Sequence, residues 1–144
     1  MRGYACVALD NPKHSINVGG VLRAAGCYRA ALVAISGTPE RLSKLPDDTM
    51  KAYRHIPHII VSDLFNVVPY DCVPVAVDIL PDAIPLPDYH HPERAFYIFG
   101  AEDATLSEHV VKRCRDKIVV PTNHCMNLAA TVNVVLYDRM AKRC

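Results

Sequence analysis

The feature that most constrains the fold of this chain is the alternation of short, continuous apolar runs with segments of helical periodicity. Six runs predict strands, over residues 4–10, 30–37, 58–62, 73–80, 94–100 and 117–121. Helical segments lie between several of them, and a closing helix is expected over residues 127–142. Strands that are apolar throughout are typical of a parallel sheet covered by helices. The sequence therefore predicts an α/β fold with a six-stranded, mostly parallel sheet and helices on both faces.

The connections between the predicted strands differ in character. The first is the helical segment VGGVLRAAGCYR (residues 18–29), which has apolar residues on one face, and Asn17 is well placed as its N-cap. Shorter helices are expected around residues 63–68 and 105–114. The stretch PDAIPLPDYHHPE, residues 81–93, is so rich in proline that it is expected to be a connector without an element of its own.

Composition limits the class of protein. A chain of 144 residues fits a single domain spanning residues 1–144, and hydrophobic and charged contents of 51% and 22% are ordinary for a folded protein. The six cysteines form no Cys-x-x-Cys pair and mostly lie in apolar stretches, which favours reduced thiols in a cytoplasmic protein. No signal peptide and no membrane span of roughly 20 apolar residues is expected. The net charge of +1 decides little about partners.

The neighbours His124 and Cys125, in the loop VPTNHCMNLAA, invite three interpretations. The thiol is a nucleophile, the pair binds a metal, or neither group does chemistry. Adjacent residues in an extended loop point apart, so His124 is a poor base for Cys125. A zinc site needs three or four ligands, and nothing nearby completes the spacing. The third interpretation is favoured, and no metal is expected.

Two further loops carry charged residues that have both a plain and a functional interpretation. Arg23 is either a solvated helical arginine or a guanidinium held near a phosphate or carboxylate. In FGAEDATLSE, Glu102 and Asp103 are general bases, metal ligands or acidic residues ahead of a helix, and local chemistry favours the last. Neither the dinucleotide-binding nor the P-loop glycine pattern is present.

Taken in order, three segments resemble a known set of motifs. INVGGVLRAAG, YIFGAEDATLS and IVVPTNHCMNLAATVNVVLYDR resemble the three successive motifs of the SpoU-type RNA 2′-O-ribose methyltransferases of the SPOUT superfamily. The resemblance covers nearly the whole chain. It implies S-adenosylmethionine as the cofactor and a C-terminal part threaded into a deep trefoil knot, which periodicity alone does not predict because threaded connections are very rare. The chain is similar to minimal members that methylate the wobble ribose of tRNA as homodimers, so tRNA is the favoured RNA.

The resemblance also assigns roles to individual residues. Arg23 matches an arginine that acts at the target ribose, with Asn17, Glu102 and Asn127 as the other expected catalytic residues. A free guanidinium has a pKa above roughly 12, so its expected role is orientation and electrostatic stabilisation. The residues expected to bind the cofactor are Val77, Gly100, Val120, Cys125 and Met126.

Three positions depart from the family pattern. Cys125 stands where serine is usual, Arg29 where glycine is common, and Ala104 where glycine usually follows the second motif. None of them removes an expected catalytic residue, so an active enzyme is expected. The alternatives are a catalytically silent RNA-binding dimer of the same fold, an rRNA substrate in place of tRNA, and methylation of a base.

Overall fold

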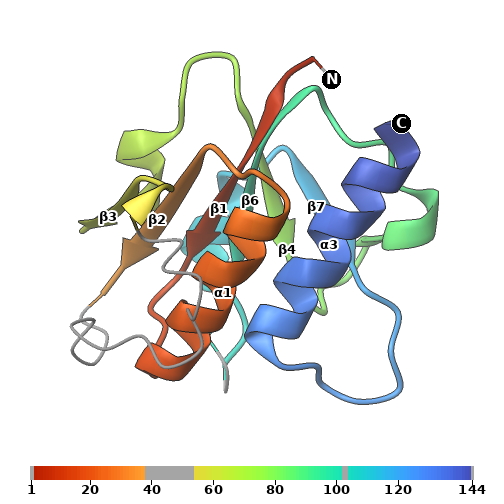
Figure 1. The fold of residues 1–144 in the computed structure, drawn as a ribbon. Helices are drawn as coiled ribbons and strands as arrows, with labels where there is room; N and C mark the ends of the chain where they lie inside the picture. Colours follow the sequence, from red (N-terminus) through yellow and green to blue (C-terminus); the bar gives the residue numbers. More distant parts are fainter. Residues whose placement is uncertain (1, 38–53, 102–103, 144) are drawn as a thin grey trace.

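The chain folds around one parallel sheet (Figure 1). The structure is a computed structural model that describes residues 2–37, 54–101 and 104–143. The seven strands of the described residues pair in the order β3-β2-β1-β6-β4-β7-β5, and every pairing is parallel. The strands are β1 (Tyr4–Leu9), β2 (Leu32–Ser36), β3 (His58–Val61), β4 (Val73–Val77), β5 (Ile84–Pro85), β6 (Arg94–Phe99) and β7 (Asp116–Val119). The parallel α/β architecture predicted from the sequence is confirmed.

Helical elements cover both faces of the sheet. The α-helices are α1 (Ser15–Cys27), α2 (Glu108–Lys112) and α3 (Leu128–Arg143), and the 3-10 helices are η2 (Leu64–Val67) and η3 (Leu86–Asp88). Helices α1 and α3 lie side by side on one face (Figure 1) and bury alternate strand residues such as Val7 and Leu9. On the other face η2 and α2 pack over the intervening residues, including Cys6 and Ala8. Across the described parts of the chain, no helix combines the length and apolar character needed to span a bilayer.

The predicted count of six strands is wrong, because a seventh lies in the proline-rich stretch 81–93. Strand β5 contains only Ile84 and Pro85, which pair with Ile118 and Val119 of β7. Two residues are too few to produce a periodic pattern. Proline is tolerated here because β5 forms the edge of the sheet, where an amide N–H is not required on the open side.

The predicted N-cap of the first helix is also wrong. Helix α1 starts three residues before Val18, and His14 is its N-cap, with an extended backbone and no side-chain capping bond. The His14 carbonyl accepts hydrogen bonds from the amides of Asn17 (3.1 Å) and Val18 (3.3 Å), which closes the first turn earlier than expected. The Asn17 side chain is instead engaged by the start of α3.

Arg29 occupies a backbone position that explains why glycine is common there. Its φ of 54° lies in the left-handed region, directly after the Tyr28 C-cap of α1. The amide of Ala30 donates to the carbonyl of Ala25 at 2.9 Å, which closes a Schellman-type helix end. Arginine at this position therefore carries the backbone cost that glycine avoids.

Helix α3 is held in place by its basic side chains, which donate to backbone carbonyls. The buried Arg139 donates to the carbonyls of Pro92 (2.7 Å) and Glu93 (2.6 Å), and Lys142 donates to that of Tyr89 (3.0 Å). The imidazole of His91, fully buried, bridges the Tyr97 hydroxyl (2.6 Å) and the Asp138 carboxylate (2.7 Å). The closing helix is therefore tied to the segment between β5 and β6.

Burial also changes the titration of this buried polar cluster. It lowers the pKa of His91, although the Asp138 carboxylate opposes the shift. It raises the pKa of Tyr97 to about 12, against the opposing effect of the Arg139 guanidinium. The tyrosine therefore stays a neutral hydroxyl, which suits the hydrogen bonds that it makes.

Candidate functional site

A cavity of about 300 Å³ opens where the central strands end. Ligands of open α/β sheets bind outside the carboxyl ends of the strands, so this is the expected place for a site. The residues lining it come from the ends of β4, β6 and β7, the loops that follow them and the first turns of α3. They are Val77, Asp78, Ile79, Phe99, Gly100, Ala101, Ala104, Thr105, Val119, Val120, Thr122, Cys125, Met126, Leu128 and Thr131. We refer to this hollow as the strand-end cavity.

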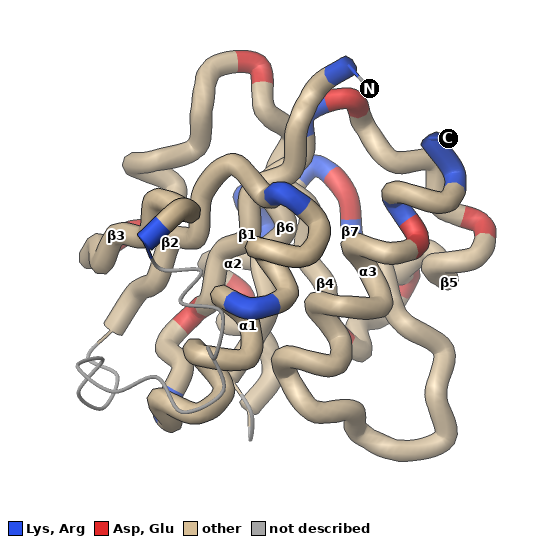
Figure 2. The backbone as a smooth tube through the Cα atoms, viewed as in Figure 1, with Lys and Arg blue, Asp and Glu red and all other residues tan. Residues whose placement is uncertain are grey.

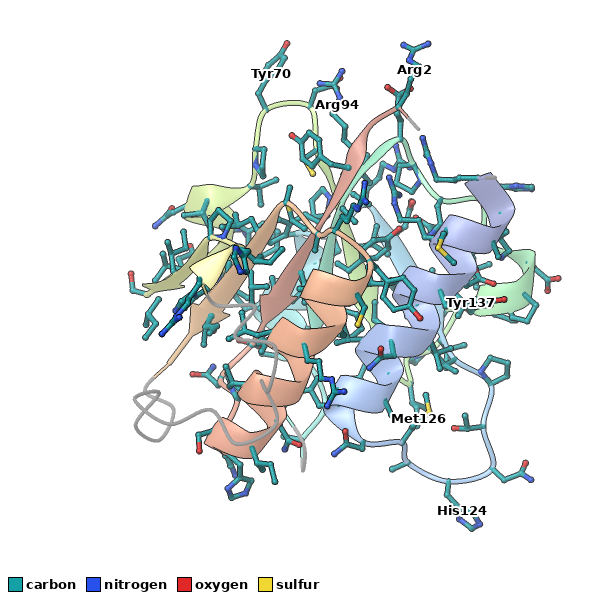
Figure 3. All side chains as sticks on the ribbon, in the orientation of Figure 1. Arg2, Tyr70, Arg94, His124, Met126 and Tyr137 are labelled. Atoms are coloured by element: carbon teal, nitrogen blue, oxygen red, sulfur yellow. The ribbon has the colours of Figure 1, made fainter. Side chains whose placement is uncertain are left out.

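The structure brings together all five residues predicted to bind a cofactor. Val77 ends β4 and pairs with Phe99, the last residue of β6, which Gly100 directly follows. Val120, Cys125 and Met126 reach the same cavity from the connection between β7 and α3. Figure 3 shows Met126 at the start of α3, and Tyr70, Arg94 and Arg2 at the opposite end of the molecule. Residues far apart in the sequence therefore share one cavity, and their role in binding stays a prediction.

Gly100 lies where even a Cβ atom would be tightly packed. A Cβ at this position would lie 3.1 Å from the carbonyl oxygen of Ala104 and 3.3 Å from the amide nitrogen of Leu106. Both are backbone atoms, which cannot rotate away. Glycine therefore allows the loop after β6 to fold closely against the strand end.

Asp78 is a site residue that the sequence analysis missed. Its Oδ1 accepts from the amide of Ile79 at 2.7 Å, and its Oδ2 from the amide of Leu106 at 2.6 Å. The carboxylate therefore joins the end of β4 to the loop after β6, across the wall of the strand-end cavity. The available signal was that Asp78 is the one charged residue in the apolar run of residues 73–80, which was predicted to be a strand throughout.

Asn17 and Asn127, both predicted to be catalytic, are in direct contact. The side-chain amide of Asn127 donates to Oδ1 of Asn17 at 3.1 Å. Oδ1 of Asn127 accepts from the amide of Ala130 at 3.2 Å, which caps the start of α3. The helices are close at this point, because a Cβ on Gly20 would lie 2.8 Å from that of Ala129. This contact links the first and third motifs.

Arg23 lies on α1, one turn beyond Gly20, and its side chain is exposed. Among the described residues it has no ion-pair or hydrogen-bond partner. A guanidinium presents several donors in a planar fork that matches phosphate and carboxylate groups. Arg23 is therefore available to a ligand from outside. Glu102, the fourth predicted catalytic residue, lies outside the described residues, as does Asp103.

None of the described residues is hydrogen-bonded to the Cys125 thiol, so no base for a catalytic thiol is found among them. His124 lies at the outer tip of the loop between β7 and α3 (Figure 3), and its carbonyl accepts from the Thr122 hydroxyl at 2.7 Å. Cys125 is exposed and lines the cavity. Within residues 2–37, 54–101 and 104–143, no three histidine, cysteine or acidic side chains are placed to hold a metal ion.

Few of the described residues around the strand-end cavity are charged. Residues 118–137 include no lysine, arginine, aspartate or glutamate. In Figure 2 the loop from β7 to α3 is accordingly tan throughout. Of the described residues that line the cavity, Asp78 alone carries a charged side chain.

The fold and the strand-end cavity place this protein among the parallel α/β proteins that bind a ligand at the carboxyl ends of their strands. The sequence model of the SpoU rRNA Methylase family matches residues 4–137. The chain therefore belongs to the SpoU rRNA Methylase family, and the resemblance seen in its motifs is confirmed. A search of the curated proteins found no match.

Solved structures share the fold at low sequence identity. The SpoU methyltransferase AviRb from Streptomyces viridochromogenes, in complex with AdoMet, has a TM-score of 0.86 and 19% identity, over 99% of this chain and 62% of AviRb. The AdoMet-bound rRNA methyltransferase from Sinorhizobium meliloti has a TM-score of 0.86 and 19% identity, over 100% of this chain and 58% of that one. This chain thus spans about three fifths of these relatives.

A third structure is similar to this protein in length as well. It is described as giving insight into the 2-OH methylation of C/U34 on tRNA. Its TM-score is 0.84 at 19% identity, and the alignment covers 99% of this chain and 92% of that chain. At these identities all three likenesses establish the shared fold.

Proposed function

We propose that this protein transfers a methyl group from S-adenosylmethionine to a ribose 2′-hydroxyl of RNA, and that the RNA is a tRNA. Membership of the SpoU family supports the class of reaction. The observation that carries the proposal is the meeting of the three motifs. The glycine and apolar residues of the second and third motifs line one cavity, and Asn127 binds Asn17 on the helix that carries Arg23.

The strand-end cavity suits S-adenosylmethionine. Its volume of about 300 Å³ is within the range of small-molecule sites, and most of its lining is apolar. Val77, Gly100, Val120, Cys125 and Met126 would hold the cofactor, with the tight loop at Gly100 bringing backbone groups close to it. When bound, S-adenosylmethionine supplies an electrophilic methyl group on a positively charged sulfur.

Arg23 and the asparagine pair would act on the RNA. Methyl transfer to a ribose requires the hydroxyl oxygen to lose its proton, which passes to solvent water, and to lie in line with the methyl group. The exposed guanidinium of Arg23 binds an RNA phosphate near the target and stabilises the developing negative charge on the hydroxyl oxygen. The hydrogen bond between Asn127 and Asn17 fixes α1 against α3, which keeps Arg23 at a constant position relative to the cavity.

A tRNA is favoured over an rRNA by the extent of one likeness. The structure concerned with C/U34 of tRNA is matched over 92% of its chain, whereas AviRb and the rRNA methyltransferase are matched over about three fifths.

Five described cysteines are free thiols, which supports a cytoplasmic protein. The alternative of a silent RNA-binding dimer has no observation in its favour.

A homodimer is part of the proposal. The outward side of α3 exposes Val134, Tyr137 and Met140. Beside it lies a shallow apolar groove between α3 and η3, to which Tyr28 and Pro87 contribute. A second copy packed here would cover apolar surface that is otherwise in water.

We also propose that the C-terminal part is knotted. Strand β7 lies between β4 and β5, although β4 and β5 are joined by the short connection of residues 78–83. The chain after β7 leads into α3, whose Arg139 and Lys142 bond to the segment between β5 and β6. Passage of the β7–α3 segment through the loop formed by residues 73–94 would account for both observations.

Locating a transferred methyl group tests the function. The purified protein is incubated with total tRNA or rRNA and S-adenosylmethionine labelled in its methyl group, and the nucleosides are then separated by mass. A label on the ribose of tRNA nucleosides is expected. A label on a base, a label confined to rRNA, or binding of RNA without transfer would each contradict the proposal in a different way.

Replacing Gly100 with valine tests the place of the cofactor. The branched side chain would collide with the backbone of Ala104 and Leu106, so the affinity for S-adenosylmethionine is expected to fall by at least about tenfold. Calorimetric titration measures the affinity. Gly26→Val is the control, because Gly26 is exposed on α1 and does not line the cavity, and it should bind normally. Equal binding by both variants would place the cofactor elsewhere.

Replacing Cys125 with serine tests whether its thiol takes part in the methyl transfer. Serine has a similar size, and no described side chain is hydrogen-bonded to this sulfur, so the transfer rate is expected to stay within about threefold of the original. A single-turnover assay with labelled cofactor gives the rate. Cys27→Ser, an exposed cysteine outside the cavity, is the control. Loss of transfer in Cys125→Ser alone would restore the nucleophile interpretation.

A further inference from the structure

The charge inside the strand-end cavity comes from one described residue. Asp78 directly follows β4, and its amide donates to the carbonyl of Ile118 at 3.1 Å, which extends the pairing of β4 with β7. The other described lining residues are apolar or uncharged. The carboxylate is therefore held at the carboxyl end of β4, and none of the other described lining residues carries a charge that could compensate it.

The hydrogen bonds of Asp78 leave part of the carboxylate available. A carboxylate has about four acceptor positions. The amides of Ile79 and Leu106 use one on each oxygen. No described lysine or arginine forms an ion pair with Asp78, so its negative charge is not neutralised there. The remaining acceptor positions are free to meet a ligand.

We infer that Asp78 makes the strand-end cavity select the cationic cofactor over its neutral product. The inference rests on the proposed function, since it takes this cavity as the cofactor site. S-adenosylmethionine carries a sulfonium, whereas S-adenosylhomocysteine, which remains after transfer, is a thioether without that charge. A carboxylate in a cavity of reduced dielectric attracts the sulfonium form more strongly. Asp78 is thus a specificity residue that favours cofactor binding and product release.

The position of Asp78 also has a structural effect, which the test must separate from the effect of charge. Because Oδ2 holds the amide of Leu106, the residue keeps the loop after β6 against Gly100, whose Cβ position would lie 3.4 Å from this oxygen. A purely structural role would change the affinities for both ligands by the same factor. A role for the charge changes their ratio.

The experiment compares the two ligands in the Asp78→Asn protein. Dissociation constants for S-adenosylmethionine and S-adenosylhomocysteine are measured by calorimetry. We expect the dissociation constant of S-adenosylmethionine to rise about tenfold. The dissociation constant of S-adenosylhomocysteine should change by less than about twofold. A common factor for both ligands, or no change in either, would overturn the inference.

Two further variants make the result specific. Asp78→Glu keeps the charge but alters its reach, so the preference for S-adenosylmethionine is expected to persist, and loss of the preference would count against the inference. Asp82→Asn removes a charge from the same connection at a residue that does not line the cavity, and its φ of 62° is one that asparagine tolerates. It should preserve both affinities, and a changed ratio there would overturn the inference.

The Gly100→Val protein separates this inference from the proposed function. If that variant binds both ligands normally, the cavity is not the cofactor site, and the proposed function fails together with the inference. If Gly100→Val weakens the binding of both ligands while Asp78→Asn leaves the ratio of their dissociation constants unchanged, the cavity remains the cofactor site. In that case only the inference about Asp78 is wrong.

Discussion

Replacing Arg23 with alanine is expected to lower methyl transfer to RNA by about a thousandfold while the affinity for S-adenosylmethionine stays within about twofold. The guanidinium is exposed, has no partner among the described residues and does not line the strand-end cavity. Its removal should therefore affect the step on the RNA and spare the cofactor. Single-turnover transfer and calorimetric titration of the same preparation measure the two quantities.

Two controls define what the loss at Arg23 means. Arg23→Lys keeps the positive charge but loses the planar fork, so we expect intermediate transfer. Arg29→Asn removes another exposed arginine near the end of α1 and accepts the left-handed backbone of that position, so transfer should be largely retained. Full transfer by Arg23→Ala would remove this residue from the mechanism. Equal losses at Arg23 and Arg29 would indicate a general effect of charge on RNA binding.

Replacing Arg139 with methionine is expected to lower the free energy of unfolding by about 3–5 kcal/mol. The side chain is 5% exposed and donates to the carbonyls of Pro92, Glu93 and Tyr4 and to the Tyr97 hydroxyl. Methionine fills a similar volume but donates none of these hydrogen bonds, so that Glu93 keeps only the amide of Tyr4 as a donor and Pro92 only Arg143. Urea unfolding at one fixed protein concentration, followed by circular dichroism, measures the change.

Arg2→Met is the matched control for Arg139. The Arg2 side chain is 89% exposed, and its ion pair with Glu93 has an N–O distance of 3.7 Å. Exposed pairs of this kind contribute little, so no measurable change in stability is expected. If Arg139→Met unfolds at the same urea concentration as Arg2→Met, the bonds between α3 and the segment before β6 do not stabilise the fold.

The sequence was sufficient for the long elements of the fold because burial imposes a pattern on them. β1 and β6 are buried on both faces, and their continuous apolar runs indicated central parallel strands. The resemblance of the motifs to the family implied which loops would meet, and Val77, Gly100 and Met126 do line one cavity. The first prediction depends on side-chain types, which the sequence records directly, and the second on the family pattern.

Interactions with the backbone were not predictable in the same way. Asp78 holds the amide of Leu106, 28 residues away, and an amide has no signature in the sequence. Strand β5 was missed because its two residues are defined by pairing with β7 and not by their own periodicity. Asn17 was misassigned as an N-cap because its side chain has a partner just before α3, in Asn127, 110 residues along the chain.

The anchoring of α3 has a consequence for how this family member can vary. Arg139, Lys142 and Arg143 bind carbonyl oxygens of residues 86–93 and of Arg2, which are present whatever side chain those positions carry. Substitutions in residues 86–93 that preserve the backbone path therefore leave these bonds intact, whereas the three basic residues have no such freedom. Mutational tolerance should accordingly be greater at the exposed positions of this segment, such as Asp88 and His90, than at the three basic residues, while the buried side chains of Leu86, Tyr89 and His91 stay constrained by their own contacts.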